Sequence, residues 1–152
     1  TLADVGGDKL PAEDITKADL DALRAGFGGT GDKIDVVVFA APQLSIVEMQ
    51  ALATLCAGKR FKSAVIVCTS PQVYPDATRM GLIDTIEDAG AKVLEGTCFY
   101  NQYAREIGEA NGWTRLLSNS AKIVNIISGY GYTPALASME KCVASAVAGE
   151  IV

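Results

Sequence analysis

Apolar residues along this chain gather in short uninterrupted runs, and longer amphipathic stretches separate these runs. The runs at 34–40 and 63–68 are rich in valine and isoleucine and lack the polar alternation of a half-exposed strand. Shorter runs at 91–94 and 113–117 lie between polar segments in the same way. We therefore expect four strands, the first two of them covered on both faces, as in a parallel sheet.

The stretches around these runs have the marks of helices. In the clearest, Ser45 and Glu48 form the S-x-x-E pattern of a capping box, ahead of a helix that ends before Gly58. The predicted helices span 16–27, 45–57, 76–89, 102–110 and 138–148. Residues 123–127 fit a strand or a buried helix equally well, because so short an apolar run does not distinguish them. Residues 129–134 are expected to form a loop.

Strands that alternate with helices at this spacing indicate an α/β fold. We expect one three-layer domain over residues 15–152, with a mainly parallel sheet of about four strands. A chain of 152 residues, of which 49% are hydrophobic, can form one proper core. Residues 1–14 show no periodicity and contain Gly6, Gly7 and Pro11, so they are expected to be a flexible tail or linker.

Ligands of parallel sheets bind outside the carboxyl ends of the strands. By that rule the loops 41–45, 69–74, 97–102 and 118–122 are expected to share one edge. The positive end of the helix that begins at Ser45 is a fitting place for an anionic group. The candidate binding groups at this edge are Gln43, Ser45, Ser118, Asn119, Ser120 and Lys122, together with the thiol of Cys98. Each polar side chain alone is better explained by a structural role, as a helix cap, a turn residue or a solvated group, than by ligand binding.

Composition excludes several classes of function. The net charge is -5 and no long run of lysine or arginine is present, so a nucleic-acid partner is not expected. The longest apolar runs are far shorter than the roughly 20 residues of a membrane-spanning helix. No signal peptide is recognisable, which favours a cytoplasmic protein. Histidine is absent, so acid–base chemistry would need other side chains or another chain.

The cysteines differ in their expected surroundings. Cys56, Cys68, Cys98 and Cys142 lie far apart without a C-x-x-C pair, which argues against a self-contained zinc site or a disulfide scaffold. Cys56 and Cys142 fall on apolar helix faces and Cys68 ends a strand, so these three are expected to be core thiols. Cys98 is expected in a loop at a strand end, and it is the candidate metal ligand.

Three stretches of the chain resemble the aconitase X group, in the part of its large subunit toward the C-terminal end. Residues 34–45, IDVVVFAAPQLS, are similar to the family's segment DLVVIGCPHLS, and residues 96–98, GTC, are similar to its DTC. Residues 118–122, SNSAK, followed by Gly129, resemble its TNSAKYAHYAPG. The resemblance runs from about Ile15 to the end of the chain and covers only part of the family's protein.

The resemblance implies a hydro-lyase (dehydratase) of the aconitase superfamily that acts on a small hydroxy acid at an iron or iron–sulfur site. It implies that Cys98 is a ligand of the iron, and that Ser118, Asn119, Ser120 and Lys122 bind the carboxylate or phosphate of the substrate. The rest of the large subunit and a small swivelling domain or subunit would complete the site. We therefore expect this chain to be a fragment that is inactive alone.

The loop after the first strand departs from the family pattern. Where many members have Cys-Pro-His, this chain has Ala41, Pro42 and Gln43, so an iron–sulfur cluster built on this loop is not expected. From this departure, and from a composition without the ion-pair density of a hyperthermophile, we favour cis-3-hydroxy-L-proline as the substrate over mevalonate 5-phosphate. A non-catalytic α/β binding or assembly module is the alternative of another class.

Overall fold

A sheet of five parallel strands forms the centre of the structure, a computed structural model that describes residues 1 and 3–152. The strand order across the sheet is β3-β2-β1-β4-β5. The strands are β1 (Val36–Leu44), β2 (Ala64–Thr69), β3 (Ala91–Glu95), β4 (Arg115–Ser118) and β5 (Thr133–Leu136). The α-helices are α1 (Lys17–Gly26), α2 (Ile46–Cys56), α3 (Tyr74–Arg79), α4 (Leu82–Asp88), α5 (Ala104–Asn111), α6 (Ala121–Ile127) and α7 (Met139–Ala148). Short 3-10 turns are η1 (Ala3–Val5), η2 (Gly7–Lys9), η3 (Phe99–Asn101) and η4 (Ser128–Tyr130).

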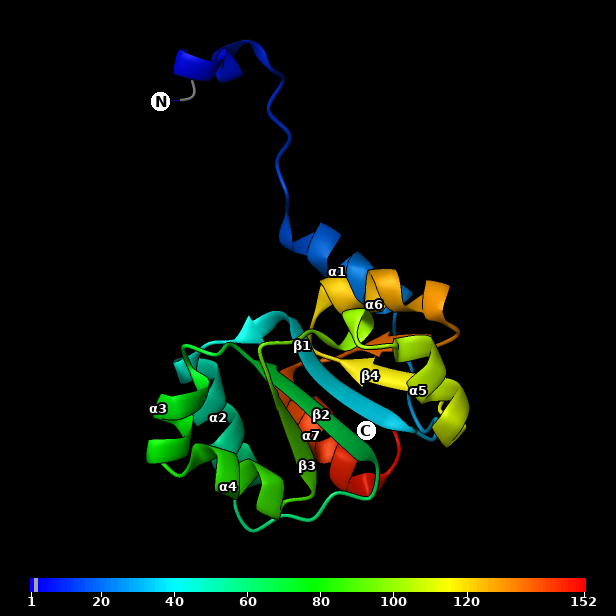
Figure 1. The fold of residues 1–152 in the computed structure, drawn as a ribbon. Helices are drawn as coiled ribbons and strands as arrows, with labels where there is room; N and C mark the ends of the chain where they lie inside the picture. Colours follow the sequence, from blue (N-terminus) through cyan, green and yellow to red (C-terminus); the bar gives the residue numbers. More distant parts are fainter. Residues whose placement is uncertain (2) are drawn as a thin grey trace.

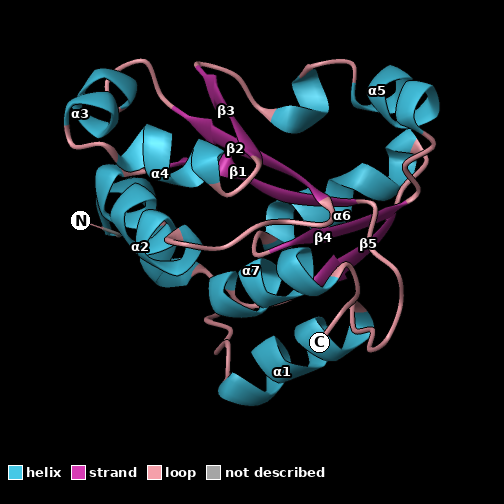
Figure 2. Cartoon of the chain, turned by 90° about the horizontal axis from the view of Figure 1, so that it is seen from below, coloured by secondary structure: helices cyan, strands magenta, loops and turns pink. Residues whose placement is uncertain are grey.

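Helices cover both faces of the sheet, which confirms the expected three layers (Figures 1 and 2). Val37 and Phe39 of β1 pack into a core with α2, α3, α4 and α7. Val36 and Val38 point the other way, into a second core with η3, α5 and α6. Because alternate residues of β1 enter one core or the other, its first six residues are all buried, and this is why no polar alternation is visible in its sequence.

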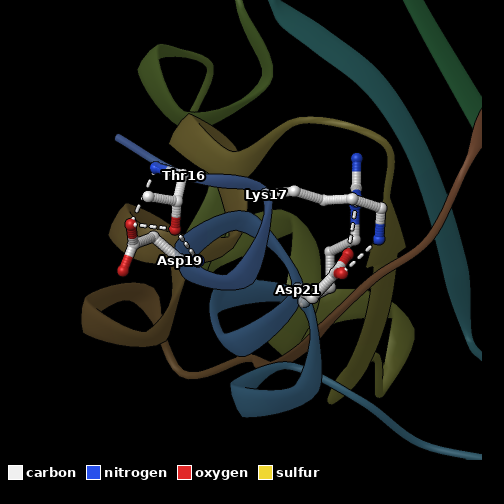
Figure 3. Close-up of polar contacts among 5 residues, drawn as sticks. Thr16, Lys17, Asp19 and Asp21 are labelled. Carbon is white, nitrogen blue, oxygen red and sulfur yellow. Dashed lines mark hydrogen bonds and ion pairs between the residues drawn. The ribbon is translucent and has the colours of Figure 1, made fainter. Parts of the chain in front are cut away.

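Helix α1 lies outside these two layers, and none of its residues is buried. Its start is fixed by a capping box. The Thr16 hydroxyl accepts a hydrogen bond from the Asp19 amide, and the Thr16 backbone amide donates to the Asp19 carboxylate at 2.8 Å (Figure 3). Lys17 and Asp21, which lie one helical turn apart, form an ion pair on the same helix (Figure 3). The preceding residues, where the sequence predicts a tail, extend away from the domain and contain η1 and η2 (Figure 1).

The structure corrects two of the predicted elements. Residues 129–134 were expected to form a loop, but Thr133 and Pro134 are the first residues of the edge strand β5. Pro134 lacks a backbone N–H, and an edge strand tolerates this because one of its sides has no neighbouring strand. The single helix expected over 76–89 is two helices, α3 and α4, separated at Gly81, whose φ of 70° is left-handed. The open question at 123–127 is answered by α6, a helix that begins after Ser120.

Three of the four cysteines are core thiols, as expected. Cys56, Cys68 and Cys142 are free and buried, whereas Cys98 is half-buried. Burial raises the pKa of Cys56 to about 11 and that of Cys142 to about 12. For Cys68, burial and then the neighbouring Cys98 raise the pKa to about 12. These three thiols therefore stay protonated and unreactive near neutral pH.

None of the helices in the described part of the chain is both long and apolar enough to cross a bilayer.

The close packing of α5 on Tyr132 leads to a stability prediction. A Cβ atom added at Gly108 would lie 2.7 Å from the Tyr132 hydroxyl oxygen, which donates a hydrogen bond to the Ala104 carbonyl. Gly108→Ala is therefore expected to lower the free energy of unfolding by about 1–3 kcal/mol in denaturant titrations, because the buried ring must shift. Gly26→Ala is the matched control, since a Cβ there meets open space at a helical position. Equal stabilities of the two variants would contradict this packing.

Candidate active site

The strand order places a crevice at the carboxyl ends of β1 and β4. The chain leaves β1 toward β2 and β3 on one side and returns to β4 and β5 on the other, so its connections diverge between β1 and β4. In open parallel sheets such a switch point is where ligands bind. A cavity of about 280 Å³ lies there, as expected for this edge. It is lined by Ala40, Ala41, Pro42, Leu44, Glu48, Asn119, Ser120, Ala121 and Lys122.

The β1 side of the cavity is a loop-like end of the strand that leads into α2. Ala41 has a left-handed φ of 52°, and the strand pairing is irregular between Phe39 and Leu44. The predicted capping box closes this side. The Ser45 hydroxyl donates to the Glu48 carboxylate at 2.6 Å, and the Ser45 backbone amide donates to it at 2.8 Å. Since Glu48 lines the cavity while it caps the helix, the negative charge at the start of α2 is supplied by the chain itself.

Two serines of the β4 side hold the cavity walls together. The buried Ser118 hydroxyl donates to the Val38 carbonyl at 2.6 Å and accepts a bond from the Ser120 amide. The Ser120 hydroxyl donates to the Ala41 carbonyl at 2.6 Å and accepts a bond from the Ile123 amide, which caps α6. The two hydroxyls thus join the end of β4 and the start of α6 to β1.

Asn119 and Lys122 are the uncommitted polar groups of this wall. Among the described residues, no hydrogen bond engages the Asn119 side chain, which is half-buried. Lys122 is exposed, and its ammonium lies 5.7 Å from the centre of the Tyr100 ring, within the range of a cation–π contact. The Asn119 side-chain amide and the Lys122 ammonium are therefore available at one cavity wall to bind an anionic or polar ligand.

The loop after β3 places Cys98 next to this region. The Gly96 amide donates to the Thr69 carbonyl at 2.8 Å, and the Gln43 side-chain amide donates to the Thr97 carbonyl at 2.8 Å. Cys98 packs at the margin of the second core and keeps part of its surface exposed. Beside it, the Thr97 hydroxyl oxygen is buried without a hydrogen-bond partner among the described residues. A buried hydroxyl of this kind indicates that a polar partner is missing at this loop.

The sequence-predicted residues therefore fall into distinct places. Asn119, Ser120 and Lys122 line the cavity. Ser118 and Ser45 hold its walls through the bonds described above. Gln43 belongs to the same end of β1 but donates away from the cavity to the Thr97 carbonyl, next to Cys98 in the loop after β3. The loop 69–74 does not line the cavity, and its Thr69 is a buried structural residue that donates to the Leu44 carbonyl at 2.7 Å.

Sequence reasoning missed two contributors. Glu48 was interpreted only as a capping residue, yet it lines the cavity. Tyr100 was passed over because a lone tyrosine in a loop has no diagnostic pattern. Its contact with Lys122 arises only when the loops after β3 and β4 are brought together.

A larger cavity of about 720 Å³ adjoins the first one. It lies between α1 and the ends of β4 and β5, and Asn119 and Ala121 line both cavities. Leu20 and Leu23 of α1 form part of its wall and remain 45% and 42% exposed. The crevice at β1 and β4 therefore continues beneath α1.

A metal at this edge would need ligands from outside the described residues, which contain no group of three or more His, Cys, Asp or Glu side chains able to hold one. Cys98 offers one thiol, a soft donor of the kind that iron accepts. The chain can thus contribute to an iron site without forming it alone.

Comparisons with known proteins agree with this architecture. The family model described as the aconitase X third domain matches residues 34–148. The phosphomevalonate dehydratase large subunit of Methanocaldococcus jannaschii is 27% identical over 121 residues, 80% of this chain and 29% of that protein. The cis-3-hydroxy-L-proline dehydratase of Pseudomonas aeruginosa is 32% identical over 120 residues, 77% of this chain and 20% of that protein.

The fold also matches a solved structure. The crystal structure of Thermococcus kodakaraensis aconitase X in its holo-form superimposes with a TM-score of 0.71 at 22% identity, over 87% of this chain and 33% of that one. The chain spans about a third or less of the length of these relatives. Since the family model covers most of the sequence and the predicted resemblance is confirmed, this chain belongs to the aconitase X family, as its third domain.

Proposed function

We propose that this chain is part of a dehydratase that removes water from a small hydroxy acid, cis-3-hydroxy-L-proline. The observation that carries the proposal is the cavity between β1 and β4, in which Asn119 and Lys122 stand uncommitted, in a domain whose relatives are dehydratases. A carboxylate is well matched to an ammonium and an amide N–H, because charge-assisted hydrogen bonds are the strong ones.

The six candidate binding residues take two kinds of role in this proposal. Asn119 and Lys122 contact the substrate carboxylate. Ser118 and Ser120 hold the wall that presents them, through their bonds to the carbonyls of β1. On the β1 side, Ser45 keeps Glu48 in place, and Gln43 retains its side-chain carbonyl oxygen as an acceptor, since its bond to Thr97 uses only the N–H group.

Cys98 would hold the iron or the iron–sulfur cluster. Its thiol is a soft donor and is half-buried. In the preceding residue, Thr97, the buried hydroxyl has no hydrogen-bond partner among the described residues, so a polar group is missing beside the thiol. When bound, iron supplies a Lewis acid for the leaving hydroxyl of the substrate. The remaining ligands would come from the rest of the large subunit, and a small swivelling domain or subunit would close the site and exclude water. This chain alone is then inactive.

Two features favour the hydroxyproline substrate over mevalonate 5-phosphate. The first is the departure of Ala41, Pro42 and Gln43 from the Cys-Pro-His of many family members. The ion pairs on the described surface are mostly isolated, for example Lys92 with Glu87, and no dense network of the hyperthermophile kind is built from them.

Assays of the whole protein that carries this domain test the proposal. With iron supplied, kcat/KM for cis-3-hydroxy-L-proline is expected to exceed that for mevalonate 5-phosphate by about 100-fold or more, because a site built around one set of polar groups rejects a substrate that leaves them unpaired. The reverse preference would assign the other substrate. No turnover of either compound by the iron-loaded protein would favour the non-catalytic binding module.

A further inference from the structure

We infer that Gln43 is a positioning residue for the Cys98 thiol, an inference that rests on the proposed function. The Gln43 Nε2 donates a hydrogen bond of 2.8 Å to the Thr97 carbonyl, across 54 residues of sequence. The loop after β1 is thereby tied directly to the residue before the proposed iron ligand.

The peptide plane explains how this bond acts on Cys98. The Thr97 carbonyl, the Cys98 amide and the Cys98 Cα belong to one planar, rigid peptide unit. A hydrogen bond that fixes the direction of the carbonyl therefore also fixes the orientation of this plane, and with it the Cys98 Cα. The segment is held on either side by backbone bonds, from the Gly96 amide to Thr69 and from the Asn101 amide to the Cys98 carbonyl. Within the described residues, Gln43 supplies the side-chain bond that orients the plane between them.

Gln43 itself is held in place on both sides, as a positioning residue must be. The Ala41 carbonyl accepts the Ser120 hydroxyl at 2.6 Å, and the Leu44 carbonyl accepts the Thr69 hydroxyl at 2.7 Å. These anchors tie the loop to the N-cap of α6, just after β4, and to the end of β2. The amide of Gln43 is therefore a donor whose own backbone is already ordered, so its bond to Thr97 transmits the geometry of the sheet to the Cys98 loop.

Placement of Gln43 relative to the cavity supports this role. Gln43 does not line the cavity between β1 and β4, although Pro42 and Leu44 on either side of it do. Its side chain instead runs to the β3 loop. The same loop thus presents Pro42 and Leu44 to the substrate cavity and Gln43 to the Cys98 segment.

The test compares Gln43→Met with Thr69→Val in the intact protein. Gln43→Met keeps a side chain of similar length but cannot donate a hydrogen bond. Thr69→Val keeps the shape of a threonine and deletes another side-chain bond of the same loop, the one to the Leu44 carbonyl, without touching the Thr97 carbonyl. The first readout is the alkylation rate of Cys98 by iodoacetamide in the iron-free protein, resolved by mass spectrometry of its peptide. The second is the iron content after reconstitution.

Gln43→Met is expected to raise the alkylation rate of Cys98 by about threefold to tenfold, the effect of losing one ordinary hydrogen bond, and to lower the iron content. Thr69→Val is expected to lower stability while leaving both readouts near wild type. Gln43→His, whose ring N–H can donate to the same carbonyl, is expected to restore them in part.

The outcomes separate this inference from the proposed function. If Cys98→Ala abolishes iron binding while Gln43→Met changes neither readout, the positioning role is wrong and the iron site stands. If Gln43→Met and Thr69→Val change both readouts equally, Gln43 acts only through loop stability and the inference is overturned. If Cys98→Ala retains iron, the proposed iron site itself fails.

Discussion

Cys98→Ala in the whole protein is expected to abolish iron binding and to reduce dehydration by about a thousandfold or more. A Lewis-acid metal contributes several kcal/mol to the stabilisation of developing charge, and each 1.4 kcal/mol is roughly tenfold in rate. Cys98 is the half-buried thiol of the four, so the loss of this ligand is not expected to disturb the packing of the two cores. Iron per chain and kcat under saturating substrate are the measurements.

Cys142→Ala is the matched control for this substitution. Cys142 belongs to α7 and is fully buried, and burial raises its pKa to about 12, so its thiol is not available to a metal. The control is expected to lose some stability and to keep its iron and its turnover per iron. Cys98→Ala protein that retains a full complement of iron would contradict the assignment.

Lys122→Gln is expected to raise KM about 100-fold while kcat falls much less. The ammonium of Lys122 is the free cation of the cavity wall in the described structure, and Tyr100 holds it at one side through a cation–π contact. In the proposed whole enzyme the site is closed over the substrate, so removing one partner of this charge-assisted bond leaves the carboxylate buried and unpaired, which costs about 2–4 kcal/mol. Steady-state kinetics with the hydroxy acid measure the effect.

Two controls separate charge at this site from charge in general. Lys122→Arg keeps the cation and is expected to retain most of the affinity. Lys141 lines the neighbouring cavity under α1, so Lys141→Gln removes a charge there instead. This variant is expected to leave KM within about threefold of wild type, because exposed charges contribute little. If Lys141→Gln raises KM as strongly as Lys122→Gln, the substrate carboxylate is bound elsewhere.

The sequence was most informative where a segment's own residues decide its structure. The valine-rich run at 34–40 predicted a strand covered on both faces, and the serines at 45 and 138 predicted the helix starts, because each pattern is local. The strand β5 was missed because its four residues, with Pro134 among them, are too short and too mixed to show a period. The break at Gly81 has a local signal, a glycine within a helical pattern. A glycine alone, however, does not show whether the segment forms one continuous helix or two separate helices.

The site could be predicted only as far as the shared edge of the sheet. That the loops after β1 and β4 face one another follows from the strand order, which no local pattern specifies. The bond from Gln43 to the Thr97 carbonyl and the contact of Lys122 with Tyr100 likewise join residues far apart in sequence. Their partners became known only from the tertiary arrangement of the three loops.

The central claim is that this domain supplies Cys98 to an iron site at the carboxyl edge of its sheet. An anomalous difference map at the iron absorption edge, from crystals of the whole protein, tests it most directly. The account predicts a peak bonded to the Cys98 sulfur, close to the Thr97 hydroxyl and open toward the cavity lined by Asn119 and Lys122. An iron peak held entirely by other residues, or iron-free crystals of a protein that dehydrates its substrate, would contradict it.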